Sequence, residues 1–261
     1  MIIDIAEKLY ISTIAPDAAE TAREFGLGLE IAEFCTASNM DAEFGAWDKK
    51  AREEMRGINR FTFHAPFNEL CPAAVDPLIV DVAKKRYEQA YELMTKYGIT
   101  TMIAHSGFVP ALYDDRWFAA KSTDFWKKFL KGKPAGFKLF LENTFERSPM
   151  LLHDIVCAVG DSRLGLCLDT GHAALSGSDA PVMEWVRQSL PFLRHVHLHN
   201  NYGSRDSHNA LDDGIADIAE VVRASTEKAP GVTFTVETRC GKTSAEWLSR
   251  SGFLRPGEDN G

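Results

Sequence analysis

The sequence has no long hydrophobic run, no paired cysteines and no excess of positive charge. No apolar stretch approaches the roughly 18 residues of a membrane-spanning helix, so we expect no membrane span. The start, "MIIDIAEKLYISTIAPD", lacks a basic segment and carries acids among its apolar residues, so we expect no secretory signal. The cysteines have no CxxC spacing, which predicts reduced thiols in a cytoplasmic protein. They are Cys35, Cys71, Cys157, Cys167 and Cys240.

The charge balance is acidic, and this limits the expected partners. The formal net charge is −8 and the pI is about 5.5. This charge argues against nucleic-acid binding driven by bulk electrostatics, although a local basic groove stays open. A bound divalent cation would offset several negative charges at its own site. We therefore expect a small-molecule partner rather than a nucleic acid. The sequence gives no indication of an oligomeric state.

Short β-rich runs recur along the whole chain, with helical patterns between most of them. Residues 76–98, 148–160 and 215–231 carry apolar residues at helical spacing. The first of these patterns closes with Gly98, a typical helix C-terminus before a strand. The β-rich runs are residues 8–13, 26–34, 60–67, 98–108, 136–144, 162–172, 193–201 and 231–239.

This alternation predicts an α/β fold, a (β/α)₈ TIM barrel. Strands that alternate with helices form a parallel sheet with helices packed outside it, and a barrel of eight such units has about this length. A doubly wound open sheet is the alternative fold. It would need a glycine-rich phosphate turn after an early strand, and "GLGLE" lacks the third glycine. We expect one domain over residues 1–261, with a ragged C-terminal tail at about 251–261.

Acids and histidines stand at or near the ends of six of the predicted strands. Active sites of such barrels form at the C-terminal ends of the strands, so these side chains should share one rim. On run two, at most one of Glu30 and Glu33 should point inward. The strand-end residues are His64, His105, Glu142, Asp169, His197 and Glu237, with His172 three residues after Asp169.

Each of these residues alone has a structural explanation, as a hydrogen-bonded core histidine or as a helix cap. The set is harder to explain in this way, because clustered buried carboxylates and imidazoles are costly unless they are paired or bind a cation. Oxygen and imidazole ligands without thiolates suit Zn²⁺, Mn²⁺, Mg²⁺, Co²⁺ or Fe²⁺, and we expect Zn²⁺, Mn²⁺ or Co²⁺. We therefore predict a divalent-metal site, with one to three ions.

Seven motifs in order resemble the xylose-isomerase-like barrel superfamily. This superfamily includes sugar and sugar-phosphate isomerases, epimerases and dehydratases, and also the endonuclease IV proteins (AP endonuclease family 2). The resemblance covers residues 8 to 240 and implies a metal-dependent enzyme. The motifs are "HAPF", "IAHSG", "LENT", "CLDTGHA", "HVHLHNN", "DSH" and "VETR".

The resemblance implies two sets of metal ligands. In the epimerase-like members one metal is held by residues that match Glu142, Asp169, His197 and Glu237, and the match of His172 faces the substrate. The endonuclease-like members hold three zinc ions with a larger set, and every position of that set is filled here. The additional ligands would be His64, His105, His172, Asp206 and His208.

Two departures from the family pattern affect the loop after run seven. Asn200 stands where the family usually has an aspartate, which puts in doubt any role that needs a carboxylate there. The segment 211–214, "LDDG", replaces the usual "LGEG" or "LGxG" and adds acids to a loop expected to face the substrate.

The leading hypothesis is an isomerase or epimerase acting on a small sugar, polyol or keto-sugar through an enediolate, with a dehydratase as its closest variant. Glu142 and Glu237 would exchange the proton. The alternative is a multinuclear zinc phosphodiesterase of the endonuclease IV type; a metal-binding barrel without activity is the third hypothesis. The expected substrate-binding residues are His172, His105, His199 and Arg239.

Overall fold

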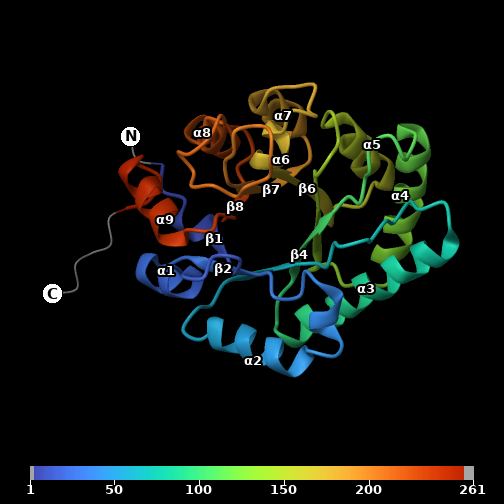
Figure 1. Ribbon diagram of the computed structural model, residues 1–261, viewed down its shortest axis with the longest axis horizontal. Helices are drawn as coiled ribbons and strands as arrows, with labels where there is room; N and C mark the ends of the chain where they lie inside the picture. The colour runs from blue at the N-terminus through green and yellow to red at the C-terminus, as the bar shows by residue number, and fades with distance from the viewer. Residues whose placement is uncertain (1–2, 256–261) are drawn as a thin grey trace.

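The computed structural model describes residues 3–255, in which eight parallel strands close into a barrel in chain order, β1 to β8. The strands form the centre and the helices surround them (Figure 1). This confirms the predicted (β/α)₈ barrel, and every predicted β-rich run contains one strand. The strands are β1 (Leu9–Ser12), β2 (Gly28–Ile31), β3 (Phe61–His64), β4 (Thr101–His105), β5 (Lys138–Glu142), β6 (Leu164–Asp169), β7 (Leu193–Leu198) and β8 (Thr233–Val236).

Helices follow the strands and cover the barrel. The predicted helical segments are confirmed as α3 (Pro77–Lys96), α5 (Met150–Val159) and α8 (Ile218–Lys228). The first of them begins where Asp76 caps the free Leu78 N–H at 2.9 Å, with Pro77 at the first helical position. The helices are α1 (Ala18–Phe25), α2 (Phe44–Glu54), α3 (Pro77–Lys96), α4 (Asp115–Leu130), α5 (Met150–Val159), α6 (Thr170–Ala174), α7 (Val182–Ser189), α8 (Ile218–Lys228) and α9 (Gly241–Arg250), with short 3₁₀ turns at Ala6–Lys8 and Ala37–Met40.

The strand register places the acids and histidines side by side. In the β4–β5 pair His105 lies opposite Glu142, and in the β6–β7 pair Asp169 lies opposite His197. Since neighbouring parallel strands lie only about 4.8 Å apart, residues paired at the same level can share one ligand. The register therefore concentrates these side chains at the C-terminal rim of the barrel.

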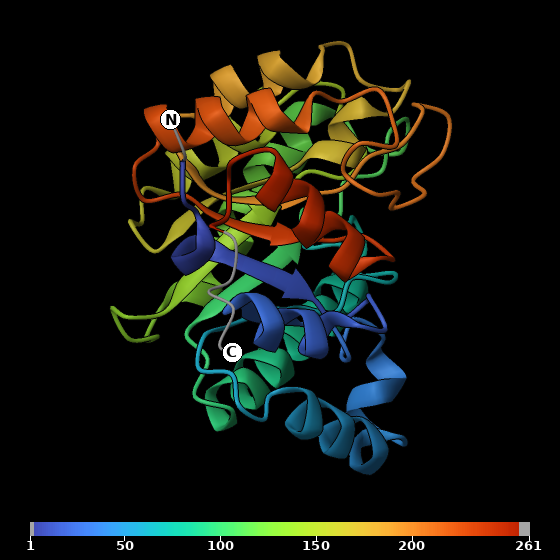
Figure 2. The ribbon, with the colours of Figure 1, turned by 90° about the vertical axis from the view of Figure 1, so that its left-hand side faces the viewer.

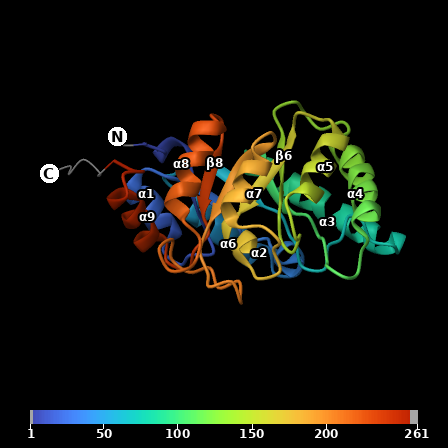
Figure 3. The same cartoon turned by 90° about the horizontal axis from the view of Figure 1, so that it is seen from above.

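The core between the sheet and the helices contains most of the aromatic residues of the 113–129 segment. Phe118, Phe125 and Trp126 of α4 are buried, while Trp117 is 40% exposed. Figure 3 shows α4 beside α5, and α7 beside α8. The longest connection near the rim, between β7 and α8, projects as a loop (Figure 2).

The segment 251–255 differs from the ragged end that we expected from the sequence. Phe253 and Leu254 are buried, and the carbonyl oxygens of Gly252 and Phe253 accept from the N–H groups of Ile3 and Ile5, each at 3.0 Å. Two apolar side chains therefore anchor this segment on the N-terminal turn. The rest of the predicted tail, 256–261, lies outside the described residues. None of the helices within residues 3–255 combines the length and apolar character needed to cross a bilayer.

Candidate metal centre

Glu142 stands at the centre of the acid and histidine cluster. Its Oε1 lies 3.4 Å from Nε2 of His105 and 3.4 Å from Nδ1 of His172. Its Oε2 lies 3.3 Å from Nε2 of His64 and 3.3 Å from Nδ1 of His197. Glu142 is fully buried at the end of β5, so both carboxylate oxygens face imidazoles rather than water. One carboxylate thus connects residues from four other segments of the barrel.

His197 connects Glu142 to the other two strand-end acids. Its Nδ1 lies 3.0 Å from Oε2 of Glu237 and 3.8 Å from Oδ2 of Asp169. His197, Asp169 and Glu237 are all buried, with at most 6% of their surface exposed. The residues predicted to hold a single metal therefore gather around one imidazole nitrogen.

The loop after β7 adds the remaining predicted ligands. Asp206 Oδ2 lies 3.2 Å from Nε2 of His172 and 3.2 Å from Nε2 of His208. His172 also contacts Asp169, at 3.4 Å, so this group continues directly from the first one. The structure thus joins all of the predicted metal ligands in one contact network.

Three of these histidines are oriented by a hydrogen bond from one ring nitrogen, so that the other ring nitrogen faces the cluster. Each Nδ1 lies near a backbone carbonyl oxygen, which only accepts, so Nδ1 carries a hydrogen and Nε2 is the nitrogen that faces the cluster. Histidines that bind a metal usually donate their other N–H in this way. The pairs are His64 with Ala65 at 2.9 Å, His172 with Asn143 at 2.8 Å and His208 with Glu237 at 2.8 Å.

The cluster lowers the pKa of its acids although they are buried. Burial would raise the pKa of Glu142, but the charges of His105 and His197 hold it well below its ordinary value. Burial likewise opposes ionisation of Asp206, and hydrogen bonds from His172 and His208 lower its pKa. These carboxyl groups are therefore ionised at neutral pH, the form in which carboxylates bind metal ions.

Several buried atoms of the cluster have no hydrogen-bond partner: both carboxylate oxygens of Glu142, Nδ1 of His197 and Oδ1 of Asp206. Unpaired buried polar atoms are costly. Nε2 of His64 and Oε2 of Glu142, 3.3 Å apart, can share a cation, either a proton or a metal ion. A divalent ion that accepts nitrogen and oxygen ligands would pair the unpartnered atoms, so these residues fit such an ion.

The cluster opens into a cavity of about 720 Å³. His64, Asp169 and His197 lie buried beneath its floor. The predicted site residues that line it are His105, Glu142, His172, Asp206, His208, Glu237 and Arg239. The expected substrate contacts His105, His172 and Arg239 are therefore all in a position to meet a molecule in this cavity.

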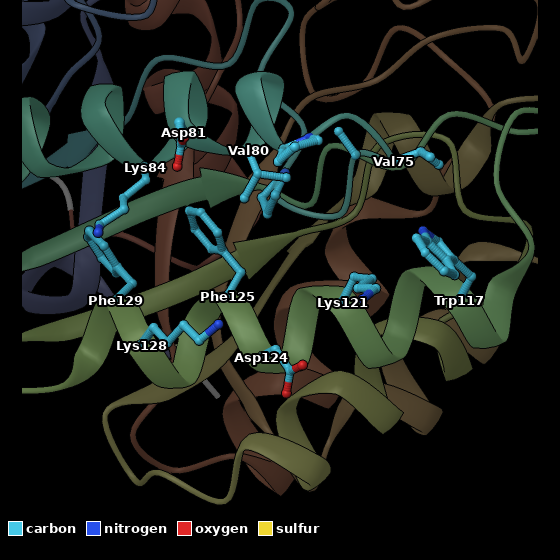
Figure 4. A pocket seen from close by; sticks show the side chains of 13 residues that line it. Val75, Val80, Asp81, Lys84, Trp117, Lys121, Asp124, Phe125, Lys128 and Phe129 are labelled. Carbon is cyan, nitrogen blue, oxygen red and sulfur yellow. The ribbon is translucent and has the colours of Figure 1, made fainter.

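A second cavity, of about 390 Å³, lies between α3 and α4 (Figure 4). Its lining includes Trp117, Phe125 and Phe129, with Lys121 and Lys128 close to them. None of the predicted site residues lines it. The aromatic residues of α4 thus pack in the core and around this outer cavity, and do not cover the metal cluster.

The family of the chain follows from a match over most of its length. Residues 19–256 match the family described as the xylose isomerase-like TIM barrel. The chain belongs to the xylose isomerase-like TIM barrel family. The resemblance seen in the sequence motifs is confirmed.

Known proteins that are similar to this xylose isomerase-like barrel include an uncharacterized protein of Methanocaldococcus jannaschii. The two sequences are 26% identical over 189 residues, which cover 67% of this chain and 63% of that protein. The match therefore spans less than two thirds of the relative's length.

Several solved structures share the fold over nearly all of this chain. A D-tagatose 3-epimerase-like protein has a TM-score of 0.73 and 20% identity, and covers 94% of this chain and 96% of its own. A Thermus thermophilus protein soaked with ZnCl₂ has a TM-score of 0.74 and 21% identity, with 94% and 97% covered. D-allulose 3-epimerase from Methylomonas sp., in complex with D-allulose, has a TM-score of 0.70 and 16% identity, with 96% and 91% covered. At these identities the likeness establishes the fold.

His199 lies deeper in this barrel than its sequence position indicated. It is fully buried, its Nε2 lies 2.9 Å from each oxygen of Asp169, and it does not line the cavity. Gly171 allows this approach, because a Cβ there would overlap the His199 ring. His195 is equally buried and bonds Thr233 and Thr235 at 2.6 and 2.8 Å, as expected of a hydrogen-bonded core residue.

Asn200, which departs from the family pattern, orders the loop after β7. Its Nδ2 donates to the carbonyl oxygens of Leu211 and Ala216, at 2.9 and 3.0 Å, and its Oδ1 accepts from the N–H groups of Asn201 and Ala216. An amide can donate and accept at once, whereas a carboxylate only accepts. Asn200 therefore suits this buried structural position. Asp212 and Asp213 of the same loop do not line the cavity.

Glu30 of β2 is a buried acid that the predicted ligand sets do not include. Its Oε1 lies 3.2 Å from Nε2 of His197, and its Oε2 accepts from the hydroxyl groups of Thr62 and Thr235, each at 3.0 Å. Burial would raise its pKa, but the charge of His197 and the other imidazole contacts lower it well below its ordinary value. Glu30 thus holds Nε2 of His197 and turns Nδ1 toward Glu142 and Glu237. In the sequence, the one indication of this position was that side chains alternate in direction along "GLGLE", so that Glu30 can point into the barrel.

Proposed function

We propose that this chain is a divalent-metal-dependent isomerase or epimerase of a small sugar, polyol or keto-sugar. The observation that carries the proposal is that Glu142 and Glu237 line the same cavity, and both contact Nδ1 of His197. Two ionisable carboxylates that reach one substrate carbon can remove a proton and return it.

The residues of the cluster take distinct roles in this reaction. Glu142, Asp169, His197 and Glu237 would hold Zn²⁺, Mn²⁺ or Co²⁺. When bound, the ion supplies electrophilic polarisation of a substrate carbonyl, which acidifies the neighbouring C–H bond. Other groups of the chain orient the substrate and move its proton.

Glu142 and Glu237 exchange the proton of the substrate carbon. One carboxylate removes it and the other returns it, which inverts the carbon or moves the carbonyl. His105 and His172 lie at the cavity surface beside Glu142 and hydrogen-bond the substrate oxygens. Arg239 at the cavity wall is placed to meet a substrate oxygen.

The similar structures support the substrate class. They include a D-tagatose 3-epimerase-like protein and a D-allulose 3-epimerase in complex with D-allulose. A third similar protein was soaked with ZnCl₂. We propose a ketose-like substrate and a divalent ion for this chain as well, because its own cluster offers suitable ligands.

Solvent proton exchange tests the proposal directly. The protein is loaded with Zn²⁺, Mn²⁺ or Co²⁺, incubated in D₂O with a panel of ketoses and keto-sugars, and the substrates are followed by NMR. We expect deuterium at the carbon next to the carbonyl of at least one substrate, and no exchange after EDTA treatment. The absence of metal-dependent exchange across the panel would contradict the proposal.

A phosphodiesterase of the endonuclease IV type is the second candidate. The observation that favours it is the position of Asp206 and His208 in the same network, which a single-metal site does not need. Three results together would favour this candidate: a stoichiometry of two or three Zn²⁺ per chain, nicking of abasic-site duplex DNA, and no deuterium exchange with the sugar panel.

Glu30 provides a prediction about how the metal is held. Glu30→Gln should weaken zinc binding by about 10–100-fold, because a ligand histidine loses the carboxylate that orients it. Competition with a chromogenic chelator measures this change. Glu33→Gln is the matched control, since Glu33 is also buried but contacts Thr13 and Lys50 instead. Equal zinc affinity in both variants would show that Glu30 has no orienting role.

A further inference from the structure

The cavity above the metal cluster has two chemically different sides. The polar side comes from the segments after β7 and β8, with Asp206, His208 and Glu237. The opposite side of the barrel, after β3, β4 and β5, contributes mainly apolar side chains. These are Phe67, Leu70, Phe108, Val109 and Phe145, continued by Ile79 of α3.

The apolar side begins at the cluster and reaches the surface. The ring of Phe67 stacks on His105, with centroids 4.3 Å apart and planes at 16°. At the outer edge Phe145, Val109 and Ile79 are 58%, 45% and 44% exposed. Large apolar side chains gathered at a cleft typically mark a surface that a ligand covers.

Outside the metal cluster, the charges of the cavity wall do not favour a phosphorylated ligand. Arg239 is the one lysine or arginine residue among the described residues that line the cavity. The carboxylate of Glu69 also lies in the lining. Phosphate groups are usually bound by several cations or by bidentate arginine contacts. A neutral substrate suits this lining better than a sugar phosphate.

The size of the cavity also exceeds what a reacting polyol head needs. Its volume of about 720 Å³ lies in the upper part of the range of about 300–1,000 Å³ found for sites of drug-sized ligands. A sugar ring over Glu142 and Glu237 leaves the space along Phe108 and Phe145 for a second group.

We propose that the substrate is an uncharged keto-sugar derivative that carries an apolar substituent, such as an aryl glycoside with a ketone on its sugar ring. This inference rests on the proposed function for the position of the sugar. The hydroxyl groups of the sugar face the carboxylates and histidines, and the substituent packs against Phe67, Phe108 and Phe145. Burial of an aromatic substituent there gains affinity from the apolar area removed from water.

Paired ligands test this inference on the full, zinc-loaded chain. Calorimetry compares methyl and phenyl glycosides of glucose, galactose, mannose and xylose, which lack the carbonyl and therefore report binding without reaction. We expect at least one phenyl glycoside to bind about tenfold or more tightly than its methyl partner, which corresponds to about 1.4 kcal/mol. If no pair in the panel shows this preference, the inference is wrong.

Two variants locate the preference in the apolar side. Phe145→Ala should remove most of the preference for the phenyl glycoside. Because Phe145 is largely exposed, this substitution should have little effect on folding. Leu112→Ala is the matched control, because Leu112 is 66% exposed in the loop between β4 and α4 but does not line the cavity. An undiminished phenyl preference in Phe145→Ala, or tighter binding of a sugar phosphate that Arg239→Ala abolishes, would overturn the proposal.

The outcome is separable from that of the proposed function. A phenyl preference without metal-dependent proton exchange would retain this substrate class and reject the isomerase. Exchange on free ketoses without any phenyl preference would retain the isomerase and reject the apolar substituent.

Discussion

Glu142→Gln should abolish stoichiometric zinc binding. Glu142 contacts more predicted ligands than any other acid of the cluster, since its two oxygens face four imidazoles at 3.3–3.4 Å. Glutamine keeps the shape of the side chain but removes the charge that a divalent ion needs. We expect zinc affinity to fall by more than the ~100-fold upper range seen for loss of an outer-shell partner.

Thermal unfolding reports this loss independently of activity. Zinc at 100 times its dissociation constant stabilises a protein that binds it only when folded by about 2.7 kcal/mol. This stabilisation should raise the unfolding temperature of the native chain when zinc is added. It should not raise the unfolding temperature of Glu142→Gln. Glu69→Gln serves as the control, because Glu69 lines the same cavity. A full zinc-dependent rise in Glu142→Gln would remove Glu142 from the metal centre.

Glu237→Gln should stop proton exchange while substrate still binds. Glu237 lies 3.0 Å from Nδ1 of His197 and borders the cavity, so its loss affects both a metal contact and the proton relay. At excess zinc the site can be loaded, and exchange should still be slower by about 10²–10⁴-fold, the usual contribution of an acid–base group.

Deuterium incorporation by NMR and substrate affinity by calorimetry, both at excess zinc, separate these two effects. Glu227→Gln on the surface of α8 is the control and should exchange at the native rate. Native-like exchange in the zinc-loaded Glu237→Gln protein would contradict the relay.

The positions of most candidate site residues could be predicted from the sequence because strand geometry is local. His64, His105, Glu142 and Asp169 each end a strand, and in a parallel barrel all strand ends meet at one rim. The β-rich runs and the helical patterns between them therefore determined both the barrel and the gathering of these side chains.

Contacts between distant segments depended on the tertiary structure. Asp206 and His208 lie in a loop, and only its folding, ordered by Asn200, brings Asp206 to His172 and His208 to Asp206. Glu30 and His197 are 167 residues apart, and their contact across the barrel is invisible to a local pattern.

The two sides of the cavity were likewise decided by the closed strand order. Phe67, Phe108 and Phe145 stand at or just after the ends of three β-rich runs in the sequence, and the closed barrel turns them to one wall. The sequence by itself determined the barrel, the chemistry of its rim and the residues available to a metal ion. The tertiary structure decided which imidazole nitrogen faces the cluster and which wall a substrate meets, because side-chain direction and loop course depend on packing between segments far apart in the chain.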